Sequence, residues 1–273
     1  MDQSLPPGLY IVATPIGNLS DLSPRAADTL RRADLVLAED TRVSGKLLKH
    51  IGASTPMRAY HDHTGEEERS AFVDRLATEA IALISDAGTP LISDPGYKLV
   101  SAARGAGHAV YSIPGPSAAV AALSIAGLPT DRFLFIGFLP AKEGARRTAI
   151  GEVAEIRATL VFYESGPRLA ETLTALADGL GDREAAVARE LTKLHEECLT
   201  GSLTELAERF ANGPPKGEIV VVVGPPQDKS AASDAELDEA IDAALQRLSP
   251  SRAAAEVADA LGVPRKRAYA RAL

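Results

Sequence analysis

Short apolar segments with the composition of buried strands alternate with helical segments along the first half of the chain. The strand-like segments are residues 8–14, 33–38, 57–60, 80–84 and 109–113. The first helical segment opens with Ser23 and Pro24, a hydroxyl N-cap followed by proline at the first helical position. Strands that alternate with helices in this way form a largely parallel sheet that is covered on both faces. The sequence therefore predicts an α/β fold.

A dense polar loop follows the strand predicted at residues 80–84. It runs from Ser85 to Gly96 and carries two aspartates, Asp86 and Asp94, together with two glycines and two prolines. Proline limits how far such a loop can flex, and glycine lets backbone amides and carbonyls approach a bound molecule. Open α/β sheets place ligands at the carboxyl ends of their strands, so this loop is a candidate binding site. An ordinary connecting turn is the alternative.

Other strand-like segments end in polar turns of the same kind. These turns are residues 14–18, 39–42 and 114–118 in the first half, and residues 163–168, 189–193 and 216–218 in the second half. Carboxyl ends of parallel strands lie along one edge of a sheet. We therefore expect the polar turns to face a common cleft between two α/β units.

The pattern of strands and helices begins again after residue 130. Strands are expected at residues 133–138, 159–163, 184–188 and 218–223, with helices at 145–156 and 168–178. A proline-rich linker then leads to three helices, and the last two flank Gly262-Val263-Pro264, a turn of helix-turn-helix spacing. The expected domains are residues 1–130, with most of the binding loops, residues 131–226, which complete the cleft, and residues 227–273, a linker and helical tail.

The charge of the chain is acidic overall but uneven near the C-terminus. A net charge of −8 argues against indiscriminate binding of nucleic acid, because affinity for its backbone comes mostly from neutralised phosphates. Residues 226–249 carry two basic and six acidic side chains, whereas residues 250–273 carry five basic and two acidic ones. Four of those basic side chains lie on the last helix, which is a candidate for contact with RNA phosphates. A solvated helix end is the alternative.

Composition also limits the cellular compartment. The single cysteine, Cys198, excludes an internal disulfide and suits a reducing environment. The short proline-rich beginning of the chain does not resemble a signal peptide, and no apolar run reaches the length of a membrane span. We expect a cytoplasmic protein without membrane contact. Only 4% of the residues are aromatic, so recognition of bases on an aromatic platform is not expected.

Several common catalytic motifs are absent from the sequence. It has no Gly-Lys-Ser/Thr P-loop, no Gly-x-Ser-x-Gly elbow and no Gly-x-Gly-x-x-Gly fingerprint. Phosphoryl transfer, serine hydrolysis and Rossmann-type dinucleotide binding are therefore disfavoured. His61 and His63 flank Asp62, but two histidines on opposite faces of a strand are poor chelators, so no metal is expected.

Longer motifs of the chain resemble those of one known family. They are residues 9–26, 38–42, 85–96, 114–118, 162–164, 189–193 and 216–218. The family is the bacterial 16S ribosomal RNA (cytidine-2′-O)-methyltransferases, which have the tetrapyrrole-methylase fold. The C-terminal helices resemble the helix-turn-helix tail of that family. One departure lies at residues 61–66, where the family has His-Asn-Glu and this chain reads His-Asp-His-Thr-Gly-Glu.

The resemblance implies two consecutive αβα domains with S-adenosylmethionine in the cleft between them. It also implies a homodimer that methylates a cytidine of 16S rRNA, within the 30S subunit, on the ribose 2′-hydroxyl. The positions that match cofactor contacts of the family are Pro15, Ala87, Gly88, Thr89, Ile92, Ser117, Ala118, Glu164, Leu191 and Glu218.

Methyl transfer from a sulfonium is an in-line displacement, so most of its catalysis is positioning. A ribose hydroxyl is a weak nucleophile and benefits from a nearby base or cation. Asp86, Glu190 and Lys193 stand at expected strand ends and are our candidates for these roles, ahead of Glu39 and Asp40. As alternatives, Glu39 and Asp40 cap the next helix, and Glu190 pairs with a neighbouring cation.

Three other functions remain open on the sequence, and one of them is a scaffold protein, which would not bind S-adenosylmethionine at all. A methyltransferase of the same fold that acts on a tetrapyrrole precursor would not require the basic last helix or the Arg146-Arg147 pair. A non-enzymatic nucleic-acid regulator would depend on residues 230–273, whereas an enzyme would keep its affinity for S-adenosylmethionine without them.

Overall fold

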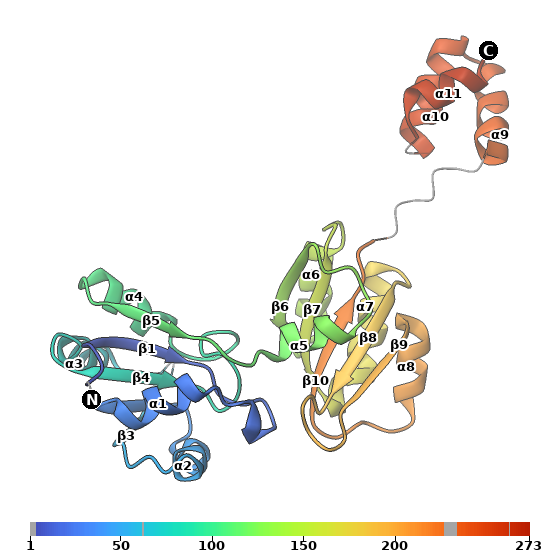
Figure 1. Ribbon diagram of the computed structural model, residues 1–273. Coiled ribbons are helices and arrows are strands. Elements are labelled where there is room, and N and C mark those ends of the chain that lie inside the picture. The colour runs from blue at the N-terminus through green and yellow to red at the C-terminus, as the bar shows by residue number, and fades with distance from the viewer. Residues whose placement is uncertain (1–3, 62, 227–233, 262) are drawn as a thin grey trace. The chain divides into compact units, whose positions relative to one another are not determined.

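The computed structural model describes residues 4–61, 63–226, 234–261 and 263–273. The chain forms two compact units, Met1–Pro225 and Pro226–Leu273. The first unit holds two five-stranded sheets, one after the other along the chain (Figure 1). The expectation of an α/β fold with two sheets and a helical C-terminal unit is confirmed. The expected boundary at residue 130 falls between the last strand of the first sheet and the first strand of the second.

The first sheet is parallel throughout, in the order β3-β2-β4-β1-β5. Its strands are β1 (Gly8–Val12), β2 (Leu35–Ala38), β3 (Met57–Ala59), β4 (Ala80–Ile84) and β5 (Val110–Ile113). They alternate with η1 (Leu19–Asp21), α1 (Pro24–Arg32), α2 (Thr41–His50), α3 (Glu66–Arg75) and α4 (Tyr97–Gly105). Ser23 caps α1 through a hydrogen bond from the Ala26 amide, as its sequence predicts.

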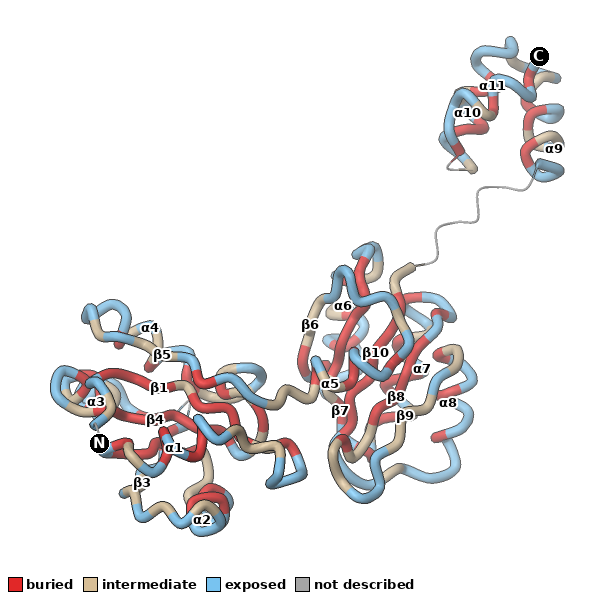
Figure 2. The backbone as a smooth tube through the Cα atoms, in the orientation of Figure 1, coloured by how far each residue is buried: buried red, intermediate tan, exposed pale blue. Residues whose placement is uncertain are grey.

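Alternate residues of these strands face two helical layers, so the sheet is buried on both sides (Figure 2). One layer contains α1 and α2, which contribute Leu30 and Leu47 to the core. The other contains α3 and α4, which contribute Phe72 and Leu99. Burial on both faces leaves the polar ends of the strands as the accessible part of the sheet.

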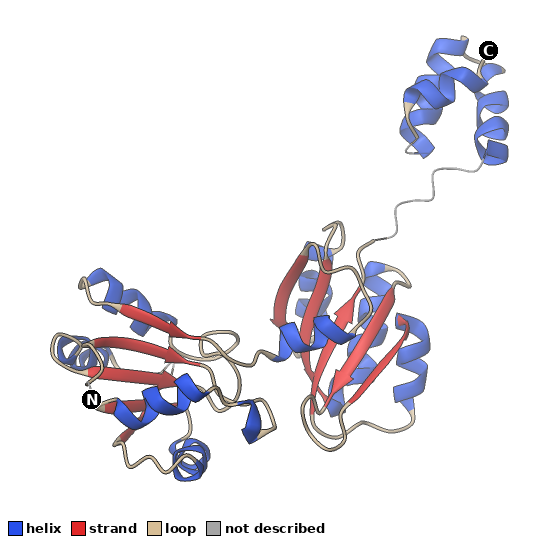
Figure 3. Ribbon diagram, viewed as in Figure 1, coloured by secondary structure: helices blue, strands red, loops and turns tan. Residues whose placement is uncertain are grey.

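The second sheet is mixed, in the order β6-β7-β10-β8-β9 (Figure 3). Its strands are β6 (Phe133–Phe138), β7 (Thr159–Ser165), β8 (Glu184–Arg189), β9 (Glu197–Ser202) and β10 (Glu218–Val223). Its helices are α5 (Ala118–Ile125), α6 (Glu143–Val153), η2 (Gly166–Arg168), α7 (Leu169–Leu180) and α8 (Leu203–Ala211). Helices α6, α7 and α8 pack on one face of the sheet, and α5 packs on the other. The expected domain of residues 1–130 includes α5, so that boundary is wrong for this helix, because its apolar face is buried against the second sheet.

Strand β10 runs antiparallel to both β7 and β8. Its first residue, Glu218, pairs with Ser165 at the end of β7, and Ile219 pairs with Arg189 at the end of β8. The start of one strand therefore meets the ends of its two neighbours. This arrangement brings the polar turns at residues 163–168, 189–193 and 216–218 to one edge, although the sheet is not parallel.

Strand β9 and helix α8 are absent from the sequence expectations. Strand β9 is a half-buried edge strand with the mixed sequence Glu-Cys-Leu-Thr-Gly-Ser, so it lacks an apolar signal. Helix α8 begins with a reciprocal capping box between Ser202 and Glu205, and that spacing is a signal that identifies its start.

The C-terminal unit consists of α9 (Asp234–Leu245), α10 (Pro250–Leu261) and α11 (Arg265–Arg271), which share a small apolar core. Arg267 donates a hydrogen bond of 2.8 Å to Asp234, and Arg271 donates one of 2.7 Å to Asp238. Two basic side chains of α11 are thus used inside this unit. Arg265 and Lys266 are exposed.

Candidate active site

A cavity of about 420 Å³ lies between the polar edges of the two sheets in the first unit. Nine of the positions matched to cofactor contacts line it: Ala87, Gly88, Thr89, Ile92, Ser117, Ala118, Glu164, Leu191 and Glu218. Asp86 lines it as well. A volume of this size is typical of small-molecule sites. The polar turns that the sequence predicts to face one cleft therefore lie around one cavity.

Two further predicted residues lie beside this cavity. A neighbouring hollow of about 360 Å³ is lined by Pro15 and Lys193, and it shares Asp86 and Ala87 with the first cavity. Glu190 lines neither of the two. Pro15 and Lys193 thus border the main cavity, and Glu190 forms an ion pair with Lys193.

The loop after β4 is held in place by backbone contacts. Thr14 and Gly88 form an isolated bridge in which the Thr14 amide donates to the Gly88 carbonyl at 2.8 Å and the Gly88 amide donates back at 3.1 Å. Gly88 has a φ of 79°, and a Cβ there would lie 3.3 Å from Ile16, so the position suits glycine. The Thr89 hydroxyl donates to the Pro116 carbonyl at 3.0 Å and couples this loop to the turn before α5. The cavity wall is thereby fixed along residues 87–89.

Asp86 is anchored by the neighbouring strand end. Its Oδ1 accepts a hydrogen bond of 3.0 Å from the Asp40 amide. Asp40 itself caps α2, because its Oδ1 accepts from the Arg42 amide at 2.8 Å. The hydrogen bond from the Arg42 side chain lowers the pKa of Asp40 to about 2. Asp40 therefore caps the next helix, which is the alternative to a catalytic role, whereas Asp86 lines the cavity.

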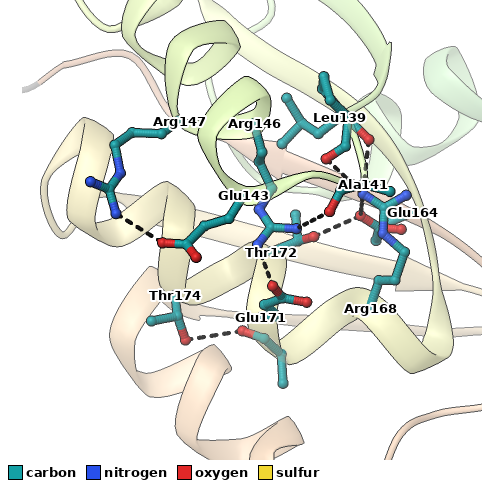
Figure 4. Close-up of polar contacts among 12 residues, drawn as sticks. Leu139, Ala141, Glu143, Arg146, Arg147, Glu164, Arg168, Glu171, Thr172 and Thr174 are labelled. Atoms are coloured by element: carbon teal, nitrogen blue, oxygen red, sulfur yellow. Dashed lines mark hydrogen bonds and ion pairs between the residues drawn. The ribbon is translucent and has the colours of Figure 1, made fainter.

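The Glu164 carboxylate is enclosed by protein groups (Figure 4). One oxygen accepts hydrogen bonds from the Ser165 amide at 2.8 Å and from the Ser165 hydroxyl at 3.2 Å. The other accepts from the Thr172 hydroxyl at 2.7 Å and lies 3.5 Å from the Arg168 guanidinium. The side chain of Glu164 is fully buried. Its carboxylate therefore braces the strand end that lines the cavity.

Two arginines hold the loop after β6 near this carboxylate (Figure 4). Arg168 donates to the Leu139 carbonyl at 2.8 Å. Arg146 is almost fully buried and contacts the Ala141 carbonyl and the Glu171 carboxylate. Arg146 belongs to the Arg146-Arg147 pair considered for RNA contact, and its burial assigns it a structural role instead. Arg147 remains exposed beside Glu143.

Glu190, Lys193 and Glu218 form an ion-pair cluster. Lys193 Nζ lies 2.9 Å from Glu190 and 3.3 Å from Glu218. The hydrogen bond from Lys193 lowers the pKa of Glu190. Burial acts to lower the pKa of Lys193, but its hydrogen bonds to Glu190 and Glu218 outweigh that effect and raise it. Glu190 has a φ of 49°, which is strained for a residue other than glycine.

Asp94, Phe138 and Tyr163 also line the cavity, and none of them is among the candidate residues from the sequence. Asp94 lies in the polar loop, so its sequence context is the signal that could identify it. Burial, with Asp86 nearby, raises the pKa of the Asp94 carboxyl. Phe138 ends an apolar strand segment, where the sequence does not distinguish core residues from cavity residues. Tyr163 begins the polar turn 163–168, which the sequence predicts to face the cleft.

No group of three or more potential metal ligands occurs among the described residues. The rings of His61 and His63 lie 6.2 Å apart, and Asp62 between them lies outside the described residues. Within the described part of the chain, no helix combines the length and apolar character that a membrane span requires.

The sequence matches two family profiles. Residues 8–207 match the Tetrapyrrole (Corrin/Porphyrin) Methylases, and residues 231–273 match the RsmI C-terminal HTH domain. Together these profiles span both compact units.

Curated relatives match almost the entire chain. A protein of Erythrobacter litoralis named ribosomal RNA small subunit methyltransferase I is 53% identical over 271 residues, which cover 99% of this chain and 96% of that protein. A protein of the same name from Mesorhizobium japonicum is 48% identical over 272 residues, covering 98% and 92%.

Solved structures match the fold. Uroporphyrin-III C-methyltransferase from Thermus thermophilus, determined in complex with S-adenosylhomocysteine, superposes with a TM-score of 0.55 at 22% identity. The match covers 80% of this chain and 97% of that protein. Similarity to the RNA-methylating relatives thus extends further along the chain than similarity to this porphyrin enzyme.

Proposed function

The chain belongs to the tetrapyrrole (corrin/porphyrin) methylase family, and on that premise we propose that it is an S-adenosylmethionine-dependent enzyme that methylates a cytidine of 16S rRNA on the ribose 2′-hydroxyl. The observation that carries this proposal is similarity over nearly the full length to proteins named ribosomal RNA small subunit methyltransferase I. That similarity includes the C-terminal unit, whereas the porphyrin enzyme matches only 80% of the chain.

The charge of the cavity fits this cofactor. S-adenosylmethionine, when bound, supplies a methyl group on a positively charged sulfur. Apart from Glu164, whose carboxylate is enclosed by protein groups, four acidic residues line the cavity, namely Glu39, Asp86, Asp94 and Glu218. None of the described residues in its wall is lysine, arginine or histidine. An acidic wall favours a sulfonium and disfavours a phosphate inside the cavity.

The backbone of the polar loop suits the amino-acid end of the cofactor. Because the amide and carbonyl of Gly88 are used by Thr14, we assign the polar contacts to Ala87 and Thr89. Gly88 then permits close approach, since it has no side chain. The small residues Ser117 and Ala118 leave room for the nucleoside on the opposite wall.

Other apolar and polar contacts complete the proposed cofactor site. We assign apolar contact to Ile92 and Leu191, and a polar contact to Glu218, because all three line the cavity. Pro15 borders it from the neighbouring hollow. We assign Glu164 a supporting role beneath its strand end, because both carboxylate oxygens already accept hydrogen bonds.

Asp86 is our candidate for taking the proton from the attacking hydroxyl. It lines the cavity, and the Asp40 amide fixes its orientation. A positioned carboxylate accepts a proton as the nucleophile attacks. Glu190 and Lys193 hold each other in an ion pair, and we assign them to positioning the turn that carries Leu191.

We also propose the cellular setting that the family resemblance implies. The substrate is 16S rRNA in the 30S subunit, the active form is a homodimer, and the enzyme works in the cytoplasm. The basic side chains Arg265 and Lys266 of the C-terminal unit support contact with RNA, because both are exposed.

Two measurements test the function. Calorimetric titration with S-adenosylmethionine is expected to give one site per chain. Tritiated methyl groups are then offered to the enzyme with either 30S subunits lacking the modification or a tetrapyrrole precursor. We expect label at a ribose 2′-oxygen of 16S rRNA. Label in the tetrapyrrole alone, or no binding of S-adenosylmethionine, would contradict the proposal.

A further inference from the structure

The cavity wall contains an aromatic ring to which the proposed methyl transfer assigns no role. Phe138 ends β6 and lines the cavity, yet it is 58% exposed. The low aromatic content of the chain argues against a platform of several rings, but a single ring at the correct place is enough to stack one base.

An irregularity in β6 directs Phe138 away from the core. The register between β6 and β7 shifts between Phe135 and Gly137, which is the pattern of a β-bulge. Gly137 has a φ of 75°, and a Cβ there would lie 2.8 Å from the Ser93 hydroxyl. Bulges commonly reorient side chains beside active sites. The bulge thus turns Phe138 toward the cavity and lets the polar loop pack against β6.

Neighbouring rings hold Phe138 in position. Its ring centroid lies 5.6 Å from that of Tyr163, with an interplanar angle of 65°. Tyr163 also contacts Phe135 edge to face, at 4.9 Å and 70°. Aromatic pairs favour such geometry. The ring is therefore ordered, although more than half of the residue is accessible.

A carboxylate lies in the same wall. Asp94 follows Ser93, the residue that packs against Gly137, and it is half-buried. Burial raises the pKa of the Tyr163 hydroxyl, the charge of Asp94 contributes to that rise, and both residues line the cavity. The Asp94 side chain also interacts with Ser85, at the base of the loop, and faces the charge of Asp86. A carboxylate that is partly removed from water gains strongly from an N–H donor.

We propose that Phe138 and Asp94 form a subsite for the base of the nucleotide that is methylated. The base stacks on Phe138, and its exocyclic amino group donates a hydrogen bond to Asp94. This inference rests on the proposed function. Aspartate accepts from the N4 amino group of cytosine, whereas uracil presents a carbonyl oxygen at the same position. The subsite therefore selects cytosine over uracil, and the acidic wall leaves the phosphates outside.

The test compares Phe138→Leu with Phe133→Leu. Phe133 begins the same strand, is 49% exposed and does not line the cavity, so it is a matched control. Methylation of 30S subunits is measured at varied subunit concentration, and affinity for S-adenosylmethionine is measured by calorimetry. We expect Phe138→Leu to raise the KM for 30S subunits about 5- to 100-fold, as loss of stacking does. Phe138→Trp is expected to have a KM for 30S subunits close to that of the wild type, because it keeps an aromatic ring. Phe133→Leu is expected to have the wild-type KM.

Affinity for S-adenosylmethionine separates this subsite from a wall of the cofactor site. We expect Phe138→Leu to leave its Kd within about twofold of the wild type. Asp94→Asn is expected to raise the KM for 30S subunits about tenfold or more. The subsite is overturned if Phe138→Leu behaves like Phe133→Leu, or if it weakens cofactor binding as much as it raises the KM. A wild-type enzyme that does not label 30S subunits overturns the proposed function first, before any variant is compared.

Discussion

Lys193 is one of the residues that connect the polar turns of the two sheets. Its ammonium pairs with Glu190 and Glu218, and its stem packs against Gly17 in the turn after β1. One residue earlier, the Thr192 hydroxyl accepts a hydrogen bond of 3.1 Å from the Asn18 amide. The contacts of this single side chain therefore contribute both to stability and to the shape of the cavity rim.

Replacing Lys193 with methionine is expected to flatten the pH dependence of stability. In the wild type, Lys193 lowers the pKa of Glu190 below its ordinary value of 4.5, so Glu190 stabilises the fold above that pH and loses this contribution as the pH falls through its folded-state pKa. The raised pKa of Lys193 adds stability that is complete below pH 10.5 and is lost as the pH rises beyond its folded-state pKa. The loss of stability at low pH and the loss at high pH should both be smaller in Lys193→Met than in the wild type. Urea unfolding between pH 3 and 11 measures the free energy of unfolding at each pH.

Lys98→Met is the control for this experiment, because Lys98 is an exposed lysine on α4 and the variant has the same net charge as Lys193→Met. It should retain the wild-type pH profile. Identical acid-side profiles for Lys193→Met and the wild type would show that the ion pair does not couple to folding.

At the scale of elements, β7 and α7 are joined by one buried hydrogen bond. The Thr172 hydroxyl donates to the Glu164 carboxylate, and both residues are buried. Thr172→Val removes this donor and leaves a buried carboxylate oxygen without it, which costs about 1–3 kcal/mol of unfolding free energy. Thr172→Ser should recover most of the loss. Denaturant unfolding followed by circular dichroism is the measurement.

Thr174→Val provides the comparison within the same helix. The Thr174 hydroxyl is exposed and donates only to the Ala170 carbonyl of its own helix (Figure 4). Substitutions of exposed residues such as this one usually change the free energy of unfolding by less than about 0.5 kcal/mol. Equal destabilisation by Thr172→Val and Thr174→Val would contradict a special role of the buried bond.

The elements also show how far the sequence predicts this protein. Apolar strands and capped helices, such as β4 and α1, are local patterns, and both lie close to the expected residues. Strand β9 is not found because an edge strand with one half-buried face needs no apolar run. Phe138 is missed for a different reason. Its exposure depends on a bulge in the pairing of β6 with β7, and that pairing is a tertiary feature.

At the scale of the whole molecule, the C-terminal unit extends the similarity to the RNA-methylating relatives beyond the fold shared with the porphyrin enzyme. Its ion pairs already occupy Arg267 and Arg271. We therefore expect Arg265 and Lys266 to make the phosphate contacts. Changing both to glutamine should reduce the slope of log affinity for 30S subunits against log salt by up to about 1.4, since each contact with a single strand contributes about 0.7.

Filter binding at several salt concentrations measures that slope, with Arg104→Gln on α4 as a control at another exposed arginine. Affinity for S-adenosylmethionine should not change in either variant. An unaltered slope in the double variant would show that Arg265 and Lys266 do not contact the RNA phosphates.

The opposite direction of β10 has a consequence for how such enzymes diversify. The segment between α8 and β10 reaches the polar edge of the sheet at Glu218, the first residue of β10. The neighbouring strands β7 and β8 reach the same edge at their last residues. Additional residues in that connection would lie next to the cavity, and the pairing of β10 with β7 and β8 would keep its register. A lineage could thereby exchange one acceptor molecule for another without rebuilding the scaffold beneath it.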